Sequence, residues 1–328
     1  MIQTDNIAIF KTVIFLIFVV SAACEQTCNG LAGLCQLRLN QVTLAGTHNS
    51  GAGFDGHLWY GSGVKALSCF YRNQGASITG QLDLGIRYFD IDACWNSYEN
   101  AAYTCHMAAY GGSIAKMLDQ VDAWMNKNRK EVVVLHFNRD YDKSEQPGKI
   151  GKDIINKIKA RWEPTQQRLS SKELSVQTNY YATLGRAVTK NQRIYIIMHT
   201  ELSKSATEPW LFWQHYVGYT WHSMSFIASS RCINLADKVA ENCFTEAKKG
   251  RSLIRLDLYL TYGLCIHDLA SWCNTRISPA AKTCRKNARQ FNKTVNFIVI
   301  DYADSEAGKK VKDIAKNENL NNIKYYTK

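Results

Sequence analysis

Segments with strand character alternate with helical segments along most of this chain. The strand-type segments are NQVTLAGTH (40–48), IRYFDIDA (86–93), EVVVLHFN (131–138), RIYIIMH (193–199), SLIRLDLYL (252–260) and NFIVIDY (296–302). The helical segments are SITGQLDLG (77–85), GGSIAKMLDQVDAWMNKNRK (111–130), residues 148–162, a lysine-rich stretch before residue 296, and SEAGKKVKDIAK (305–316), with Ser305 as its N-cap. Strands that alternate with helices predict a parallel sheet with the helices packed outside it.

A weaker strand-type stretch at 216–221 brings the count to seven or eight strands. We therefore predict an α/β fold with a single closed (β/α)8 barrel, and an open doubly wound sheet is the alternative. The chain has 328 residues, of which 46% are hydrophobic, and this is enough for a large core. Because no linker rich in proline, glycine or serine interrupts the pattern, residues 24–328 are expected to form one domain.

The first residues have the features of a secretory signal peptide. TVIFLIFVVSAA (12–23) is apolar, follows Lys11 and ends in small residues, as the hydrophobic part and cleavage site of a signal peptide do. It is shorter than the about 20 residues that a membrane-spanning helix needs. We therefore expect residues 1–23 to be removed and the protein to be secreted. The glycosylation sequon Asn292–Thr294 agrees with an extracellular glycoprotein.

Eleven cysteines also indicate an oxidising compartment. Cleavage after Cys24 would leave an even number, and cleavage before it would leave one cysteine over. Cys28 and Cys35 are close enough in sequence for a local disulfide, as are Cys94 and Cys105, which flank one loop. The other pairings do not follow from the sequence, and no CxxC pair indicates zinc.

The chain is basic, with a net charge of +12. A basic secreted protein is attracted to anionic partners such as acidic lipids or phosphorylated sugars, although many of the lysines also suit solvated helix faces. We expect an anionic membrane surface as a partner, and a monomer. Nucleic acid is not expected, because the chain has no basic and aromatic binding motif.

Four of the strand-type segments end in polar side chains. Asp90 and Asp92 are two residues apart, so both project to the same side of their strand as Tyr88. The active groups of a parallel barrel gather at the carboxyl ends of its strands. The candidates at these ends are His48, Asn49, Asp90, Asp92, His136, Asn138 and Asp301, with His106 in the loop after the second strand.

Histidines and clustered acids at a barrel mouth suit the cleavage of a phosphodiester. One imidazole removes a proton from the attacking hydroxyl, and another returns a proton to the leaving oxygen. Paired carboxylates at such a site cost desolvation energy unless a metal ion, an arginine or a protonated histidine lies beside them. That cation would also neutralise the charge that develops on the phosphate.

Three stretches of the sequence resemble a known family. GTHNS (46–50), LDLGIRYFDID (82–92) and CHMAAYGGSIAKMLDQVDAWMNKNRKEVVVLHFN (105–138) are similar to the X region of phosphatidylinositol-specific phospholipase C, in its small secreted branch. The similarity runs over about residues 40–140, with weaker support from NFIVIDYAD (296–304). It implies a somewhat distorted (β/α)8 barrel and a phosphoric diester hydrolase.

The resemblance also implies roles for three residues at an exposed barrel mouth. His48 and His106 match the two catalytic histidines of the family. His48 would be the general base toward the hydroxyl beside the phosphate and His106 the general acid toward the leaving group, or the reverse. Asp301 matches an acid that orients the first histidine in metal-free members.

A calcium site is implied as well. Asn49, Asp90 and Asp92 match the ligands of the calcium-dependent members, whereas metal-free members have an arginine at the position of Asp92. Calcium is therefore expected, since carboxylate and amide oxygens are its usual ligands. His136 is a departure, because it stands where those members have a further acidic ligand. The rival is a metal-free site in which a nearby Arg or Lys, such as Arg255, replaces the cation.

Two aromatic stretches are candidates for a membrane-binding rim. One is PWLFWQHYVGYTW (209–221), for which ordinary packing is the stronger interpretation. The other is the loop 51–75, with Phe54, Trp59, Tyr60, Phe70 and Tyr71.

Three functions fit these features. The first is cleavage of a phosphoinositide or related phospholipid by attack of the neighbouring inositol hydroxyl. The second is a catalytically silent barrel that binds anionic head groups. The third is a phosphodiesterase that acts on choline or glycerol phosphodiesters with magnesium.

Overall fold

A computed structural model describes most of the chain. The described residues are 27–52, 71–106, 109–139, 146–163, 169, 182–204, 206–220, 231–259 and 266–328. The predicted signal segment 1–23 lies outside these residues, as does most of the aromatic loop 51–75. No described helix is both long and apolar enough to cross a membrane.

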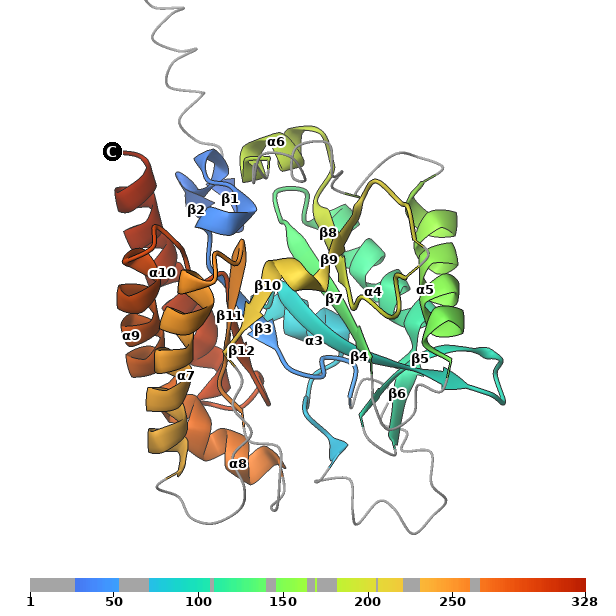
Figure 1. Ribbon diagram of the computed structural model, residues 1–328. Helices are drawn as coiled ribbons and strands as arrows, with labels where there is room; N and C mark the ends of the chain where they lie inside the picture. Colours follow the sequence, from blue (N-terminus) through green and yellow to red (C-terminus); the bar gives the residue numbers. More distant parts are fainter. Residues whose placement is uncertain are drawn as a thin grey trace, which may run out of the picture.

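Parallel strands form the centre of the protein (Figure 1). Their order around the sheet follows their order in the chain, and the last strand pairs with the first. They are β3 (Leu44–Thr47), β4 (Tyr88–Asn96), β7 (Val133–Arg139), β8 (Ile194–Met198), β9 (Leu211–Trp213), β10 (Val217–Tyr219), β11 (Leu253–Asp257) and β12 (Phe297–Ile300). Among the described residues no pairing joins β9 to β10, which are connected by the short turn η5 (Gln214–Tyr216). The predicted barrel is therefore confirmed, with one open seam.

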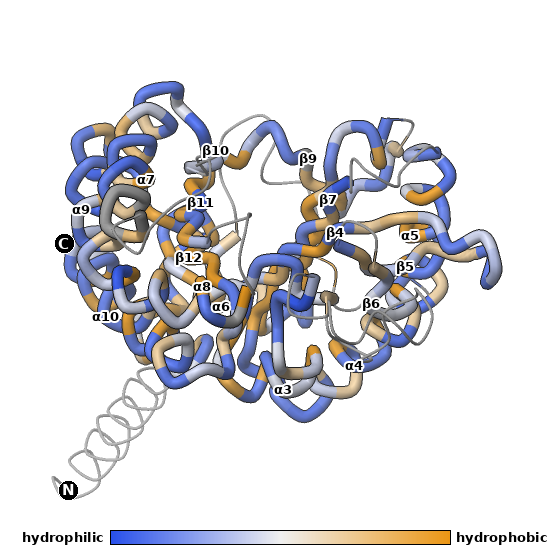
Figure 2. Tube along the Cα trace, turned by 90° about the horizontal axis from the view of Figure 1, so that it is seen from below, coloured by the Kyte–Doolittle hydropathy of each residue, from blue (hydrophilic) through white to orange (hydrophobic). Residues whose placement is uncertain are grey.

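Helices surround this sheet (Figures 1 and 2). On one side lie α3 (Ile78–Asp83), α4 (Ile114–Lys127) and α5 (Pro147–Trp162), and on the other side lie α7 (Arg231–Lys248), α9 (Ile277–Arg289) and α10 (Val311–Tyr326). In α4, Ile114, Leu118 and Val121 recur at helical spacing and are fully buried against the strands. The helix begins where the Ser113 side chain accepts a hydrogen bond from the Lys116 amide.

The last helix begins later than its sequence pattern predicts. Ser305 is not the N-cap of this helix: its hydroxyl accepts from the Gly308 amide at 3.0 Å, at the start of the short turn η7 (Gly308–Lys310), whose N-cap is Ala307. The α-helix α10 then begins at Val311. The stretch 111–113, predicted as the start of a helix, belongs instead to the strand β6 (Ala109–Ser113).

The amino end of the barrel is closed by the first part of the described chain. Here lie β1 (Thr27–Cys28), β2 (Leu31–Ala32), η1 (Leu34–Gln36) and η2 (Leu39–Gln41), with α6 (Leu184–Thr189) beside them. Leu34, Leu37 and Leu39 belong to the same buried cluster as Tyr88 and Phe297, which point inward from the strands. Apolar side chains therefore fill the half of the barrel at the amino ends of the strands, so the interior there is a packed core rather than a channel.

Beyond the barrel, β4 continues into an antiparallel extension with β5 (Ala101–His106) and β6. This extension projects to the side of the barrel in Figure 1. A disulfide between Cys94 and Cys105 joins β4 to β5 next to His106. The predicted pairing is confirmed, and it ties the strand that carries His106 to the strand that carries Asp90.

Disulfides also tie the helices together. Cys28–Cys35 is confirmed, and two bridges not foreseen in the sequence join α7 to α8 (Ile266–Cys273) and α9. Cys232 and Cys243 of α7 are eleven residues apart, which is about three helical turns, so both lie on one face of this helix. The two bridges are Cys232–Cys273 and Cys243–Cys284.

The protein without residues 1–24 is expected to carry no more than one free thiol. Bridges account for the described cysteines, and Cys24, Cys69 and Cys265 lie outside the described residues. Alkylation under denaturing, non-reducing conditions followed by mass spectrometry counts the free thiols, and peptide mapping identifies the Cys94–Cys105 link. Several alkylated cysteines would contradict both the disulfide framework and the oxidising compartment.

Candidate functional site

The carboxyl ends of the strands bring together side chains that are far apart in the sequence. Along β11, Leu253, Arg255 and Asp257 are two residues apart, so they share the inward face. Leu253 lies in the cluster inside the barrel, whereas the alternate residues of this strand pack outward against the helices. The same alternation holds on β3, β4, β7 and β12. The barrel interior therefore has an apolar layer toward the amino ends of the strands and a polar layer at their carboxyl ends, which is called the upper layer here.

The turn after β3 places His48. The His48 amide donates to the Ile300 carbonyl at 2.9 Å, and this extends the pairing of β3 with β12. Asn49 then adopts a left-handed φ of 42°, which asparagine tolerates better than most residues. Gln81 holds the turn, because its Nε2 donates to the Ser50 carbonyl and its Oε1 accepts from the Thr47 hydroxyl.

His48 and Asp301 are in direct contact. The His48 Nδ1 and the Asp301 Oδ1 lie 3.0 Å apart, and Asn73 Nδ2 donates to the same carboxylate oxygen at 2.9 Å. His48 is only 8% exposed, so the prediction of an exposed ring is wrong for this histidine. The cause is Tyr259, whose ring is stacked on the imidazole at 3.6 Å between centroids with an interplanar angle of 6°. Asn73 and Tyr259 were not predicted.

The second predicted histidine faces the first. The ring centroids of His48 and His106 are 6.1 Å apart, with an edge-to-face angle of 72°. The His106 Nδ1 lies 3.0 Å from the Tyr71 carbonyl, a contact in which the ring nitrogen donates. His106 is partly exposed, in contrast to His48. This separation is an ordinary edge-to-face contact between two aromatic rings, so the two imidazoles border one site.

Burial sets the charge of the first histidine and its partner. It lowers the pKa of His48 to about 3, a shift that Asp90 opposes and Arg255 reinforces. It raises the pKa of Asp301 to about 8, although the hydrogen bond from Asn73 opposes this rise. The imidazole of His48 is therefore neutral near pH 7, as a group that accepts a proton must be.

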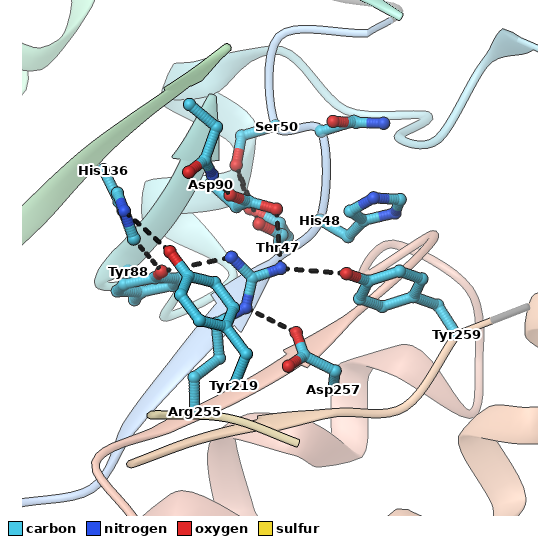
Figure 3. A network of polar contacts seen from close by, with 12 residues as sticks. Thr47, His48, Ser50, Tyr88, Asp90, His136, Tyr219, Arg255, Asp257 and Tyr259 are labelled. Carbon is cyan, nitrogen blue, oxygen red and sulfur yellow. Dashed lines mark hydrogen bonds and ion pairs between the residues drawn. The ribbon is translucent and has the colours of Figure 1, made fainter. Parts of the chain in front are cut away.

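A buried arginine occupies the centre of the upper layer (Figure 3). Arg255 Nη2 donates to Asp90 Oδ2 at 2.7 Å and to the Tyr259 hydroxyl at 3.0 Å. Its Nε donates to Asp257, and its Nη1 donates to the Tyr88 hydroxyl at 3.3 Å. A guanidinium that is 2% exposed is thus held by two carboxylates and two phenols.

The residues predicted to bind calcium do not lie together as a free set. One oxygen of Asp90 accepts from Arg255 and the other accepts from Asn138. Asp92 follows on the same face of β4 and is partly exposed. Asn49 is the member that best suits a ligand, because its Oδ1 is buried and has no hydrogen-bond donor in the described part of the chain. No cluster of three or more His, Cys, Asp or Glu side chains able to hold a metal occurs among the described residues. The calcium site stays a prediction.

His136 is committed to other contacts. Strand pairing places it opposite Asp90, but its Nδ1 lies 2.5 Å from the Tyr88 hydroxyl and its Nε2 lies 3.0 Å from the Tyr219 hydroxyl. Burial lowers the pKa of His136 below its usual range, and Arg255 lowers it further. A neutral ring that is bonded through both nitrogens is part of the packed interior.

Most of the aromatic residues proposed for a membrane rim cannot be placed. Phe54, Trp59, Tyr60 and Phe70 lie outside the described residues. In the stretch 209–221, the side chains that the structure describes at Trp210, Leu211 and Phe212 are buried. For these residues the packing interpretation is confirmed.

Fold and site together define an α/β barrel with a paired imidazole and carboxylate at the carboxyl ends of its strands. The PI-PLC X family model (PI-PLC X 1) matches residues 34–232, more than half of the chain. The protein therefore belongs to the PI-PLC X family.

Curated relatives agree with this assignment. PI-PLC X domain-containing protein 1 of Arthroderma benhamiae is 30% identical over 114 residues, which cover 34% of this chain and 33% of the relative. PI-PLC X domain-containing protein 3 of Mus musculus is 34% identical over 79 residues, or 24% of each chain. The matches thus span a third or less of these relatives.

Solved structures show the same fold. One mutant of phosphatidylinositol-specific phospholipase C from Staphylococcus aureus has a TM-score of 0.57 at 15% identity, covering 86% of this chain and 96% of that one. A second mutant of the same protein has a TM-score of 0.56 at 14% identity, covering 84% of this chain and 92% of that one.

Proposed function

We propose that this protein is a secreted phosphodiesterase that cleaves phosphatidylinositol-type lipids between the phosphate and the glycerol oxygen. The observation that supports this most directly is the facing pair of imidazoles, one of which is bonded to a buried carboxylate. Family membership supports phosphodiesterase chemistry. The disulfides between helices and strands support secretion, because such bridges persist in oxidising compartments.

In this mechanism His48 is the general base. Its Nδ1 proton is held by Asp301, so the other ring nitrogen, Nε2, accepts the proton of the inositol hydroxyl beside the phosphate. That hydroxyl oxygen forms a bond to phosphorus as the bond from phosphorus to the glycerol oxygen breaks. His106 gives its proton to the departing oxygen, so the products are a cyclic inositol phosphate and diacylglycerol.

The two histidines differ in ways that suit these separate roles. His48 is buried and neutral, which favours accepting a proton. His106 is partly exposed, so it can exchange protons with solvent between turnovers. The roles are therefore assigned in this order rather than the reverse.

A head-group release assay on phospholipid vesicles tests the proposal. Phosphatidylinositol is expected to release its head group, whereas phosphatidylcholine and phosphatidylglycerol at the same concentration are not. Release from choline or glycerol lipids instead would identify a different phosphodiesterase. Vesicle binding without release from any lipid would identify a silent head-group binder and overturn the proposed activity.

A further inference from the structure

Arg255 is a buried cation in the upper layer of the barrel, and it contacts acids from two strands. Asp90 comes from β4, and Asp257 comes from β11 itself. All three side chains are at most 3% exposed. Removing one charge from such a group leaves its partner buried and uncompensated, which is strongly unfavourable. Asp90 therefore requires a cation, and Arg255 meets that requirement.

The same arginine reaches the first histidine through one intermediate residue. Arg255 Nη2 holds the Tyr259 hydroxyl at 3.0 Å, and the Tyr259 ring lies flat against His48. Asp301 contacts the Nδ1 atom at the edge of the same imidazole ring. The ring of His48 is thus fixed in its plane by Tyr259, which lies beside it in Figure 3, and in its rotation by Asp301.

A metal bound by Asp90 would have to share this space with the guanidinium. Both carboxylate oxygens of Asp90 already accept hydrogen bonds from Arg255 and Asn138. A divalent ion within bonding distance of Asp90 would lie close to the positive charge of Arg255, and the two would repel each other. The residues at this position therefore fit a guanidinium better than calcium.

We propose that Arg255 takes the place of a metal ion in this site: it neutralises Asp90 and Asp257 and positions His48 through Tyr259. The role of His48 in this statement rests on the proposed function. Arg255 is a positioning residue, because its contacts are to the protein. Together with its two acids it carries a formal charge of −1, so the phosphate charge is met by another group, for which protonated His106 is suited.

Metal independence is tested without any substrate. The melting temperature of the wild-type protein is expected to be the same, within about 1 °C, in calcium chloride and in EGTA. A specifically bound ion at saturating concentration would raise it by about 5 °C or more. A clear rise in calcium that is lost in Asp90→Asn would overturn the proposal, whatever the enzyme activity.

The positioning of His48 by Tyr259 and Arg255 is tested by the proton NMR spectrum of the His48 ring, again without substrate. A ring stacked at 3.6 Å shifts the imidazole proton signals upfield, and the His48→Gln variant identifies which signals belong to His48. Arg255→Ala and Tyr259→Ala are expected to abolish this shift, and Tyr259→Phe to weaken it. An unchanged shift in Arg255→Ala would show that the arginine does not hold the stack.

Kinetics complete the test on a protein that cleaves lipid. Arg255→Ala is expected to lower kcat about 10²-fold with KM changed by less than about threefold, because His48 is misaligned while substrate contacts remain. Arg255→Lys should recover part of the loss, since it keeps the charge but cannot contact Asp90, Asp257 and Tyr259 at once.

The matched control is Arg193→Ala. Arg193 is also 2% exposed, but it contacts the carbonyls of Asn128 and Glu131 at the amino end of β8. If Arg193→Ala lowers kcat as much as Arg255→Ala does, the effect of Arg255 is general destabilisation and the proposal fails. An inactive wild type with the expected melting and proton spectra would refute the proposed function but leave the metal-free arrangement supported.

Discussion

Replacing His48 by glutamine is expected to lower the turnover of phosphatidylinositol about 10²–10⁴-fold while the protein still folds. Glutamine fills much of the volume of the ring but does not accept a proton near neutral pH. It is preferred to alanine because His48 is 8% exposed and packed against Tyr259, so truncation would leave a cavity beside a buried carboxylate. Head-group release under saturating substrate measures the loss, and circular dichroism with thermal melting checks the fold.

His106→Gln is expected to cause a loss of similar size, since each histidine transfers one proton in the same reaction. The double variant should lose little more than either single variant, because the two groups act as a unit. His215→Gln is the matched control, since His215 is exposed on η5. Near-normal turnover in either His48→Gln or His106→Gln would show that the assigned roles are wrong.

The strands and most of the site candidates could be predicted because they follow local rules. Mostly apolar stretches mark β4, β7 and β12, and the polar residues toward each strand end stand out against them. The barrel rule then places His48, Asp90 and Asp301 at one end of the molecule, which is where the structure has them. Resemblance to the family, rather than any local pattern, supplied the specific roles.

The missed contacts depend on residues that are distant in sequence. Tyr259 stacks on His48 and Asn73 bonds to Asp301, and neither partner is marked by a motif. One signal was available in the sequence. Arg255, Asp257 and Tyr259 are each two residues apart along their strand, as Asp90 and Asp92 are along theirs. This period of two predicts that all three point into the barrel, where a buried arginine must meet acids.

His136 shows why a position alone does not define a ligand. It lies opposite Asp90 in the pairing of β4 with β7, at the strand end where the sequence places it. Its function, however, depends on whether water, a metal or other side chains reach the ring. Two tyrosine hydroxyls from β4 and β10 fill that space, and the sequence does not show that these three strands converge on one side chain.

Asp301→Asn is expected to lower turnover about 10²–10⁴-fold, the range found when the carboxylate behind a catalytic histidine is lost. Asparagine keeps the shape but offers an amide that can donate to Nδ1, which would stabilise the tautomer with its proton on Nε2. That tautomer cannot accept a proton from the attacking hydroxyl. Asp304→Asn is the matched control, because Asp304 accepts from the Gly75 amide nearby without contacting His48.

The pH profile separates this role from a loss of stability. Because burial raises the pKa of Asp301 to about 8, the pair of Asp301 and His48 retains an extra proton below that pH and loses it above. Only the form without the extra proton has a carboxylate that accepts from Nδ1 and a free Nε2. The kcat/KM of the wild type should therefore rise as the pH increases toward about 8. Asp301→Asn should lack this rise, because asparagine does not titrate. The same rise in that variant would show that another group causes the increase in kcat/KM with pH, and Asp301 would then have no part in the mechanism.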